Sequence, residues 1–129
     1  MKSCTVLFLL FLTMYNGMYA MDIIKVSGAN FVDENENSIV FNGLNASDPD
    51  KLEKDGHWNE RYFKEMADWG SNLVRFPVHP TAWRSRGEEG YFELLDQGIA
   101  WAKKYNMYVI IDWHIIGNLR NQLFQHDMY

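Results

Sequence analysis

Two apolar segments with the composition of buried β-strands constrain the fold more than any other feature of this sequence. They are SNLVRFPVHP (71–80) and YVIIDWH (108–114), and a stretch with helical periodicity lies between them. Strands buried on both faces read as nearly continuous apolar runs, and such strands joined by helices form parallel sheets. The sequence therefore predicts an α/β fold in which helices cover a parallel sheet.

Helical periodicity precedes each of these two segments. The first predicted helix begins after the cap Asn59, ends at Gly70, and has a core face of Trp58, Tyr62, Met66 and Trp69. The second predicted helix stops near Asn106 and has a core face of Phe92, Leu95, Ile99 and Ala102. The charged segment TAWRSRGEEG (81–90) between the strand and the second helix is interpreted as a loop.

The segment before the first helix is interpreted as a hairpin followed by a loop. IKVSGANFVDENENSIVF (24–41) has two apolar stretches around the polar cluster 33–38, which predicts a β-hairpin with a long turn. NGLNASDPD (42–50) contains the Gly, Asn, Asp and Pro residues that are typical of loops. The hairpin's second arm then serves as the first strand before the helix.

Residues 1–20 have the layout of a secretory signal peptide: Lys2, an apolar run over 5–14 and a more polar end at Ala20. A membrane anchor is the alternative, but the run is shorter than the roughly 20 residues that span a bilayer. We therefore expect residues 21–129 to be exported, to the outside of the cell or to a periplasm. Cleavage would remove Cys4, the only cysteine, so the core and not disulfides would hold the protein together.

The charge distribution narrows the class of partner. The formal net charge is −5, and acidic and basic residues are mixed without a long run of either sign. This argues against nucleic acid or an anionic membrane as the partner and favours a neutral or cationic ligand.

Polar residues interrupt both apolar segments. Arg75 lies among apolar neighbours, so its charge needs a partner, and a structural ion pair and a functional role are equally open. Asp112 and His114 are two residues apart in an extended segment, so their side chains point to the same side and Trp113 points to the other. For His114, a satisfied core histidine is the alternative to a functional role. His79 and His114 follow adjacent strands without metal-ligand spacing, so no metal is expected.

A resemblance emerges from three strings: MADWGSNLVRFPVHPTAW (66–83), LLDQGIAWAKKYNMYVIIDWHIIGNL (94–119) and LFQHDMY (123–129). From about residue 25 onward, the chain resembles the N-terminal part of glycoside hydrolase family 5, the cellulase family. The most specific elements are NLVRFPV and YVIIDWH at the right separation. The resemblance implies the N-terminal hairpin and first three βα units of a (β/α)8 TIM barrel.

The resemblance also implies an activity and roles for individual residues. Members hydrolyse β-linked glucans, mannans or related glycosides with retention of configuration, and need no metal or organic cofactor. Arg75 matches the arginine that supports the nucleophilic carboxylate, and His114 matches the histidine that lines the subsite beside the bond that is cut. The further candidates for binding a β-linked polysaccharide or oligosaccharide are His79, Trp83 as a stacking platform in the loop, Asp112 and Asn118.

Both catalytic carboxyl groups of the family are missing from this sequence. Retaining glycosidases need two, about 5 to 5.5 Å apart. The family supplies one from an Asn-Glu-Pro motif after the fourth strand and one from a Glu after the seventh, and a full barrel takes about 250 residues. We expect the chain to be the N-terminal part of a larger secreted endo-β-glucanase, inactive by itself. The alternatives are a non-catalytic carbohydrate- or partner-binding partial barrel, and a β-mannanase of the same family.

Overall fold

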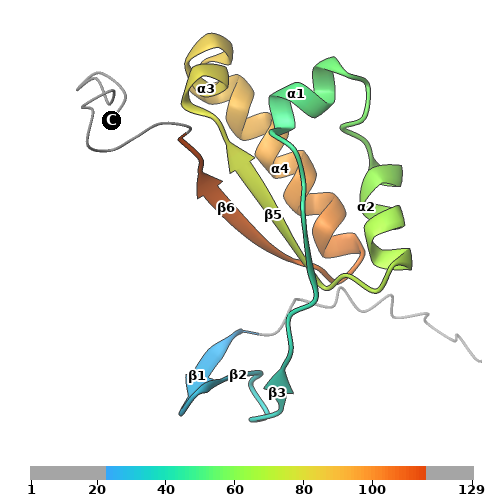
Figure 1. Cartoon of the computed structure of the whole chain (residues 1–129), viewed down its shortest axis with the longest axis vertical. Coiled ribbons are helices and arrows are strands. Elements are labelled where there is room, and N and C mark those ends of the chain that lie inside the picture. The colour runs from blue at the N-terminus through green and yellow to red at the C-terminus, as the bar shows by residue number, and fades with distance from the viewer. Residues whose placement is uncertain (1–22, 116–129) are drawn as a thin grey trace, which may run out of the picture.

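The computed structural model describes residues 23–115, which form two small sheets and four helices (Figure 1). The three parallel strands have the order β4 (Gly43–Asn45), β5 (Leu73–Val78) and β6 (Tyr108–Trp113). An antiparallel sheet of β1 (Lys25–Ser27), β2 (Asn30–Val32) and β3 (Ser38–Ile39) lies at the end where the parallel strands begin (Figure 1). The predicted α/β class is confirmed, and β5 and β6 are the two strands predicted from the apolar segments.

The first parallel strand is not the one that the sequence predicted. β4 forms within the segment interpreted as a loop, and its residues pair with the start of β5, from Gly43 opposite Leu73 to Asn45 opposite Arg75. Three residues are too few to show a strand pattern, which explains the error. β5 pairs along its whole length with β6, from Leu73 opposite Tyr108 to Val78 opposite Trp113.

The antiparallel sheet contains two hairpins instead of one. Gly28 has φ +61° and lies in the tight turn between β1 and β2, a conformation that glycine adopts without steric cost. Asp33 organises the turn between β2 and β3, since its Oδ1 accepts hydrogen bonds of 2.8 Å from the backbone N–H groups of Asn35 and Asn37. The second hairpin is the predicted one. The first lies inside a segment interpreted as a single arm.

The four helices are α1 (Pro49–Lys54), α2 (Glu60–Asp68), α3 (Pro80–Arg86) and α4 (Glu88–Lys104). α2 and α4 were predicted, and the predicted cap Asn59 accepts a hydrogen bond from the backbone N–H of Tyr62. The interpretation of α1 and α3 as loops was wrong. Each begins with proline, a residue whose fixed φ and missing N–H suit the first position of a helix.

The core lies between the parallel sheet and the helices. Alternate residues of β5, namely Val74, Phe76 and Val78, are buried, and Phe63 of α2 packs against Phe76 with ring centroids 5.9 Å apart. The core residues of α4 are Tyr91, Leu94, Leu95, Gly98 and Ala102. This face is rotated from the predicted one, because Phe92 and Ile99 are partly exposed.

Trp69 corrects another core prediction. Its side chain is 77% exposed, because it is the residue that ends α2 and no longer follows the helical face. Trp58, which precedes α2, is buried as predicted.

Both faces of β6 are partly uncovered in the part of the chain that the structure describes. Ile110 and Ile111 are 45% and 52% exposed, although their sequence predicts burial on both faces. Within residues 23–115 the three parallel strands form an open sheet and not a closed barrel. No helix in this range is long and apolar enough to cross a membrane.

Candidate functional site

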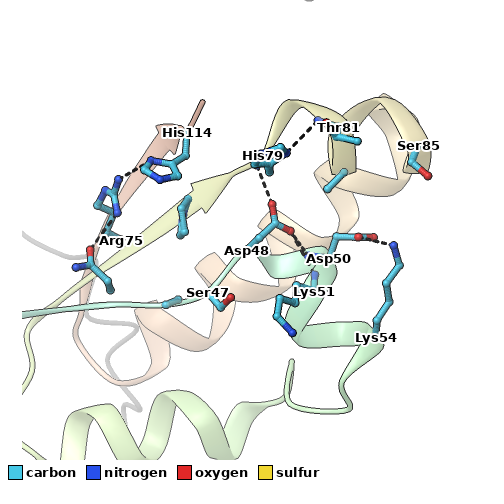
Figure 2. Close-up of a pocket in the computed structure, with 14 residues that line it drawn as sticks. Ser47, Asp48, Asp50, Lys51, Lys54, Arg75, His79, Thr81, Ser85 and His114 are labelled. Atoms are coloured by element: carbon cyan, nitrogen blue, oxygen red, sulfur yellow. Dashed lines mark hydrogen bonds and ion pairs between the residues drawn. The ribbon is translucent and has the colours of Figure 1, made fainter. Parts of the chain in front are cut away.

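A pocket of about 760 Å³ opens where the parallel strands end (Figure 2). Its walls come from the ends of β4 and β5, from His114 directly after β6, and from α1 and α3. In parallel α/β sheets this edge carries the ligand sites, because the loops that follow the strands converge there.

Arg75 is the central charge of the pocket and does have partners. It lies on β5 between β4 and β6, where its Nη1 donates a hydrogen bond of 3.2 Å to Asn45 Oδ1. Its Nη2 forms a short ion pair with Asp112 Oδ2. The Arg75 and Asp112 side chains are each about 30% exposed, so the pair is not sealed in the core, and Arg75 is the member that lines the pocket.

Asp112 and His114 lie on the same side of the chain, as predicted. His114 Nδ1 is 2.9 Å from Asp112 Oδ2 and 3.1 Å from Arg75 Nη2. Trp113 points to the opposite face, where its ring packs against Trp83 with centroids 5.7 Å apart. The structure therefore brings three of the predicted site residues, Arg75, Asp112 and His114, into one hydrogen-bonded group.

His79 joins the pocket through a second group, which is centred on Asp48 (Figure 2). Asp48 Oδ1 accepts the backbone N–H of Asp50 at 2.8 Å and so caps α1. Its Oδ2 accepts the backbone N–H of His79 at 2.7 Å and the Tyr91 hydroxyl at 2.9 Å. One carboxylate thus joins the ends of β4 and β5 to α4.

Salt bridges between α1 and α3 form the outer wall. Asp50, which is 5% exposed, pairs with Lys54 at 2.6 Å and with Arg86 at 2.7 Å. Burial by itself raises the pKa of Asp50, but the hydrogen bonds from Lys54 and Arg86 outweigh it and hold the pKa below its ordinary value. The carboxylate is therefore ionised and bound to its partners at neutral pH.

The predicted binding residue Trp83 lies elsewhere. Trp83 is on α3 and not in a loop, and its ring packs against Tyr91 and Phe92 at centroid distances of 5.2 Å. It is not among the residues that line the pocket. Asn118 lies outside the described residues, as does the predicted signal peptide, so their roles stay predictions.

Sequence reasoning missed Asn45 and Asp48. Asn45 ends a strand too short to recognise, and its position opposite Arg75 follows only from the pairing of β4 with β5. Asp48 had a readable signal, since Asp followed by Pro is a common way to begin a helix. Within residues 23–115, no group of three or more His, Cys, Asp and Glu side chains is placed to hold a metal ion.

Solved structures similar to this chain are glycan-degrading enzymes. A β-glucanase from Saccharophagus degradans, in complex with cellotetraose, is 37% identical with a TM-score of 0.75; the match covers 85% of this chain and 33% of that chain. The catalytic domain of an endoglucanase from Thermobifida fusca has a TM-score of 0.61 at 23% identity, with 72% and 30% covered, and supports the fold alone. This chain therefore corresponds to about a third of each structure.

Curated relatives match a shorter stretch. Endoglucanase C from Evansella cellulosilytica is 41% identical over 58 residues, which is 44% of this chain and 7% of that protein. A glucan 1,3-β-glucosidase from Schwanniomyces occidentalis is 36% identical over 66 residues, which is 45% of this chain and 16% of that protein.

The family described as Cellulase (glycosyl hydrolase family 5) matches residues 32–129, which is more than half of the chain. The parallel βα units of the described residues superpose on part of the TIM barrel of such enzymes. From this match and this fold, the chain belongs to glycosyl hydrolase family 5.

Proposed function

We propose that this chain forms part of the substrate cleft of a secreted, retaining glycoside hydrolase that cleaves β-linked glucans. The observation that carries the proposal is the pocket at the strand ends, which Arg75 and His114 line in a chain of this family, with Asp112 bound to both of them beside it. A similar β-glucanase was solved with cellotetraose, a β-linked oligosaccharide, which supports this class of ligand. Secretion rests on the signal-peptide layout of residues 1–20.

In this proposal Arg75 supports the nucleophilic carboxylate and His114 lines the subsite beside the bond that is cut. A guanidinium carries five N–H donors. Within the described residues, the bonds to Asn45 and Asp112 occupy two of them. Nη2 also lies 3.1 Å from His114 Nδ1, and in the proposal the other donors bind a second carboxylate or a sugar hydroxyl in the pocket.

The acids that line or border this pocket are already engaged in the described part of the chain. Asp48 caps α1 and binds Tyr91, Asp50 is held by Lys54 and Arg86, and Asp112 is held by Arg75. A retaining mechanism needs one carboxyl group as nucleophile and another as acid/base. The proposal therefore gives the described residues binding and supporting roles, and places both catalytic glutamates in a later part of the whole enzyme.

The same observation favours a second function for the chain by itself, namely binding a β-linked glycan without cleaving it. Among residues 23–115, the pocket has partners for sugar hydroxyls, and the acids that line or border it are bound to other side chains. Within the hydrolase class, a β-mannanase stays an alternative. The curated relatives include both endoglucanases and glucan 1,3-β-glucosidases, so the linkage cleaved is also open.

A titration with two tetrasaccharides tests the ligand class. Cellotetraose, which is β-linked, should shift the NMR signals of Asn45, Arg75 and His114 in a saturable way. Maltotetraose, its α-linked isomer, is the matched control and should leave them unchanged. Equal shifts with both sugars, or no shift with cellotetraose, would contradict a β-glycan site.

A chimera tests the contribution to catalysis. Residues 32–115 of this chain would replace the corresponding segment of the Saccharophagus degradans β-glucanase, and hydrolysis of β-glucan would be measured. Arg75→Ala in the chimera should lower kcat about 100-fold or more, the loss typical of one electrostatic contact in an active site. Arg61→Ala, which removes an exposed arginine paired with Glu65 on α2, should have no effect. Full activity of the Arg75→Ala chimera would contradict the proposed role of Arg75 in supporting the nucleophilic carboxylate.

A further inference from the structure

We propose that Asp112 is a positioning residue that holds neutral His114 in the Nδ1–H tautomer, the opposite of the His79 tautomer. The pocket then offers a ligand hydroxyl an imidazole acceptor at His114 and an imidazole donor at His79. The role in sugar binding rests on the proposed function, whereas the tautomers can be measured on the chain without any sugar.

Three atoms around His114 carry the first half of the inference. Asp112 Oδ2 receives the short ion pair from Arg75 Nη2, and it lies 2.9 Å from His114 Nδ1. Arg75 Nη2 and His114 Nδ1 are themselves 3.1 Å apart. Arg75 Nη2 and His114 Nδ1 both contact Asp112 Oδ2. The presence or absence of a proton on Nδ1 therefore decides whether His114 is attracted to this carboxylate or repelled by it.

An ionised carboxylate only accepts hydrogen bonds. If Nδ1 carried no proton, its lone pair would face Asp112 Oδ2 at 2.9 Å, and two acceptors would be held together without a hydrogen. With a proton on Nδ1, the histidine donates a charge-assisted hydrogen bond to Oδ2, which is the stronger type. Arg75 Nη2 carries two N–H groups: one donates to the same oxygen, and in the opposite tautomer the other would donate to Nδ1 across 3.1 Å. That tautomer would still leave the Nδ1 lone pair facing the carboxylate, whereas the Nδ1–H tautomer removes this repulsion.

His79 has the reverse arrangement. The backbone N–H of Thr81 donates to His79 Nδ1 at 3.3 Å, as part of the cap of α3. A backbone N–H cannot accept a hydrogen bond, so Nδ1 of His79 must be the unprotonated nitrogen when the ring is neutral. Its proton therefore lies on Nε2.

Both rings line the same pocket, and in each ring Nδ1 is occupied by the protein. The nitrogen left for a ligand is Nε2, which is an acceptor in His114 and a donor in His79. A carboxylate that fixes the tautomer of a histidine by a bond to Nδ1 has the same effect in serine-protease triads. A sugar hydroxyl can both donate and accept, so it can satisfy either ring.

The test is a two-dimensional NMR spectrum of the ring nitrogens of the full chain labelled with nitrogen-15. It is recorded near pH 8.5, about two units above the ordinary histidine pKa of about 6.5. His114→Gln and His79→Gln identify the two spin systems by the signals that disappear. The expected result is a protonated Nδ1 in His114 and a protonated Nε2 in His79. A protonated Nε2 in His114 of the unmodified chain overturns the proposal.

Two variants separate Asp112 from Arg75 as the cause. Asp112→Ala should shift His114 to the Nε2–H form, which free neutral histidine prefers, whereas Arg75→Met should leave the Nδ1–H form in place. Asp68→Ala removes an equally charged, ion-paired but distant carboxylate and should change neither ring. An unchanged tautomer in Asp112→Ala, or a changed one in Arg75→Met, overturns the assignment. Failure of cellotetraose to bind while the tautomers hold would instead count against the proposed function.

Discussion

Tyr91 donates a hydrogen bond of 2.9 Å to Asp48 Oδ2, although the two residues are 43 positions apart in the sequence. Tyr91 is fully buried near the start of α4, and Asp48 caps α1 at the rim of the pocket. The same Asp48 oxygen also accepts the backbone N–H of His79. The pocket wall is therefore fixed to the core through a single carboxylate.

Removing the Tyr91 hydroxyl should destabilise the protein. We expect Tyr91→Phe to lower the free energy of unfolding by about 1.5–3 kcal/mol, the range for a hydrogen bond to a charged group. Urea denaturation measures this change. Tyr105→Phe is the matched control, because it removes a hydroxyl bonded to Glu60, whose side chain is 44% exposed, and it should cost less than Tyr91→Phe. Equal losses of unfolding free energy in the two variants would contradict the conclusion that the bond between Tyr91 and Asp48 fixes the pocket wall to the core.

The same tyrosine should make stability depend on alkaline pH. Burial, and then the hydrogen bond to Asp48, raises the pKa of Tyr91 far above its usual 10.0. The unfolded chain loses this proton near pH 10 while the folded chain keeps it, so stability is present below about pH 10 and is lost as the pH rises further. Thermal unfolding between pH 8 and 11 should show a smaller decline for Tyr91→Phe. An identical decline would refute the assignment.

Asp50 should contribute to stability at the acid end. Its pKa is held below the ordinary 3.8, because the hydrogen bonds from Lys54 and Arg86 outweigh the effect of burial. The contribution is present above about pH 4 and is lost as the pH falls below that value. Asp50→Asn should therefore lower stability at pH 7 by about 1–3 kcal/mol. In Asp50→Asn, the free energy of unfolding should also fall less steeply as the pH drops below about 4. An unchanged fall would contradict the expectation.

Gly98 should be intolerant of a larger residue. A Cβ added there would lie 2.5 Å from Trp58 Cζ2 and 3.0 Å from Phe76 Cε2. We expect Gly98→Ala to cost about 1–3 kcal/mol, as overpacking does, despite the better helix propensity of alanine. Gly90→Ala in the same helix meets only the flexible Arg86 side chain, at 3.1 Å, and should be neutral or stabilising. Chemical denaturation measures the free energies of unfolding of Gly98→Ala and Gly90→Ala, which are then compared.

Trp83 should matter for folding more than for binding. Its ring packs against those of Tyr91, Phe92 and Trp113 on the helix side of the sheet. Trp83→Ala should lower the free energy of unfolding by about 3 kcal/mol, near the low end for a tryptophan truncation because the ring is only partly buried. Affinity for cellotetraose should change less than twofold. A large loss of affinity in the folded variant would support the stacking role predicted from the sequence.

The parts of the fold that the sequence predicted are those with a long, strong pattern. β5 and β6 are mostly apolar, β6 also has a run of β-branched residues, and α2 has both a cap at Asn59 and a glycine after its end. The short elements were not predicted, because β4 has three residues and α1 and α3 have six and seven, which is too short for a clear pattern. For these, the only signals were Asp-Pro and His-Pro at the helix starts.

The site was predictable to a similar extent. Arg75 stood out as a charge among apolar strand residues, and Asp112 and His114 stood out as polar residues at the end of an apolar strand; the structure joins all three. Asn45 and Asp48 depend on pairing between segments about 30 residues apart or more, which no local pattern contains. The pattern of α4 also misplaced its core face, since Tyr91 and Gly98 are buried in place of the expected Phe92 and Ile99.

The bonds that join Asn45, Arg75 and Asp112 across three neighbouring strands form only when those strands are correctly aligned. A slip of β5 by one residue would turn Arg75 to the side that Val74 and Phe76 now occupy, and would place its charge among apolar helix residues. Misaligned sheets are thereby penalised at the strand ends beside the pocket. A substitution of Arg75 or Asp112 would also weaken this protection against misfolding, so a change made to alter the proposed binding is expected to lower the fidelity of folding as well.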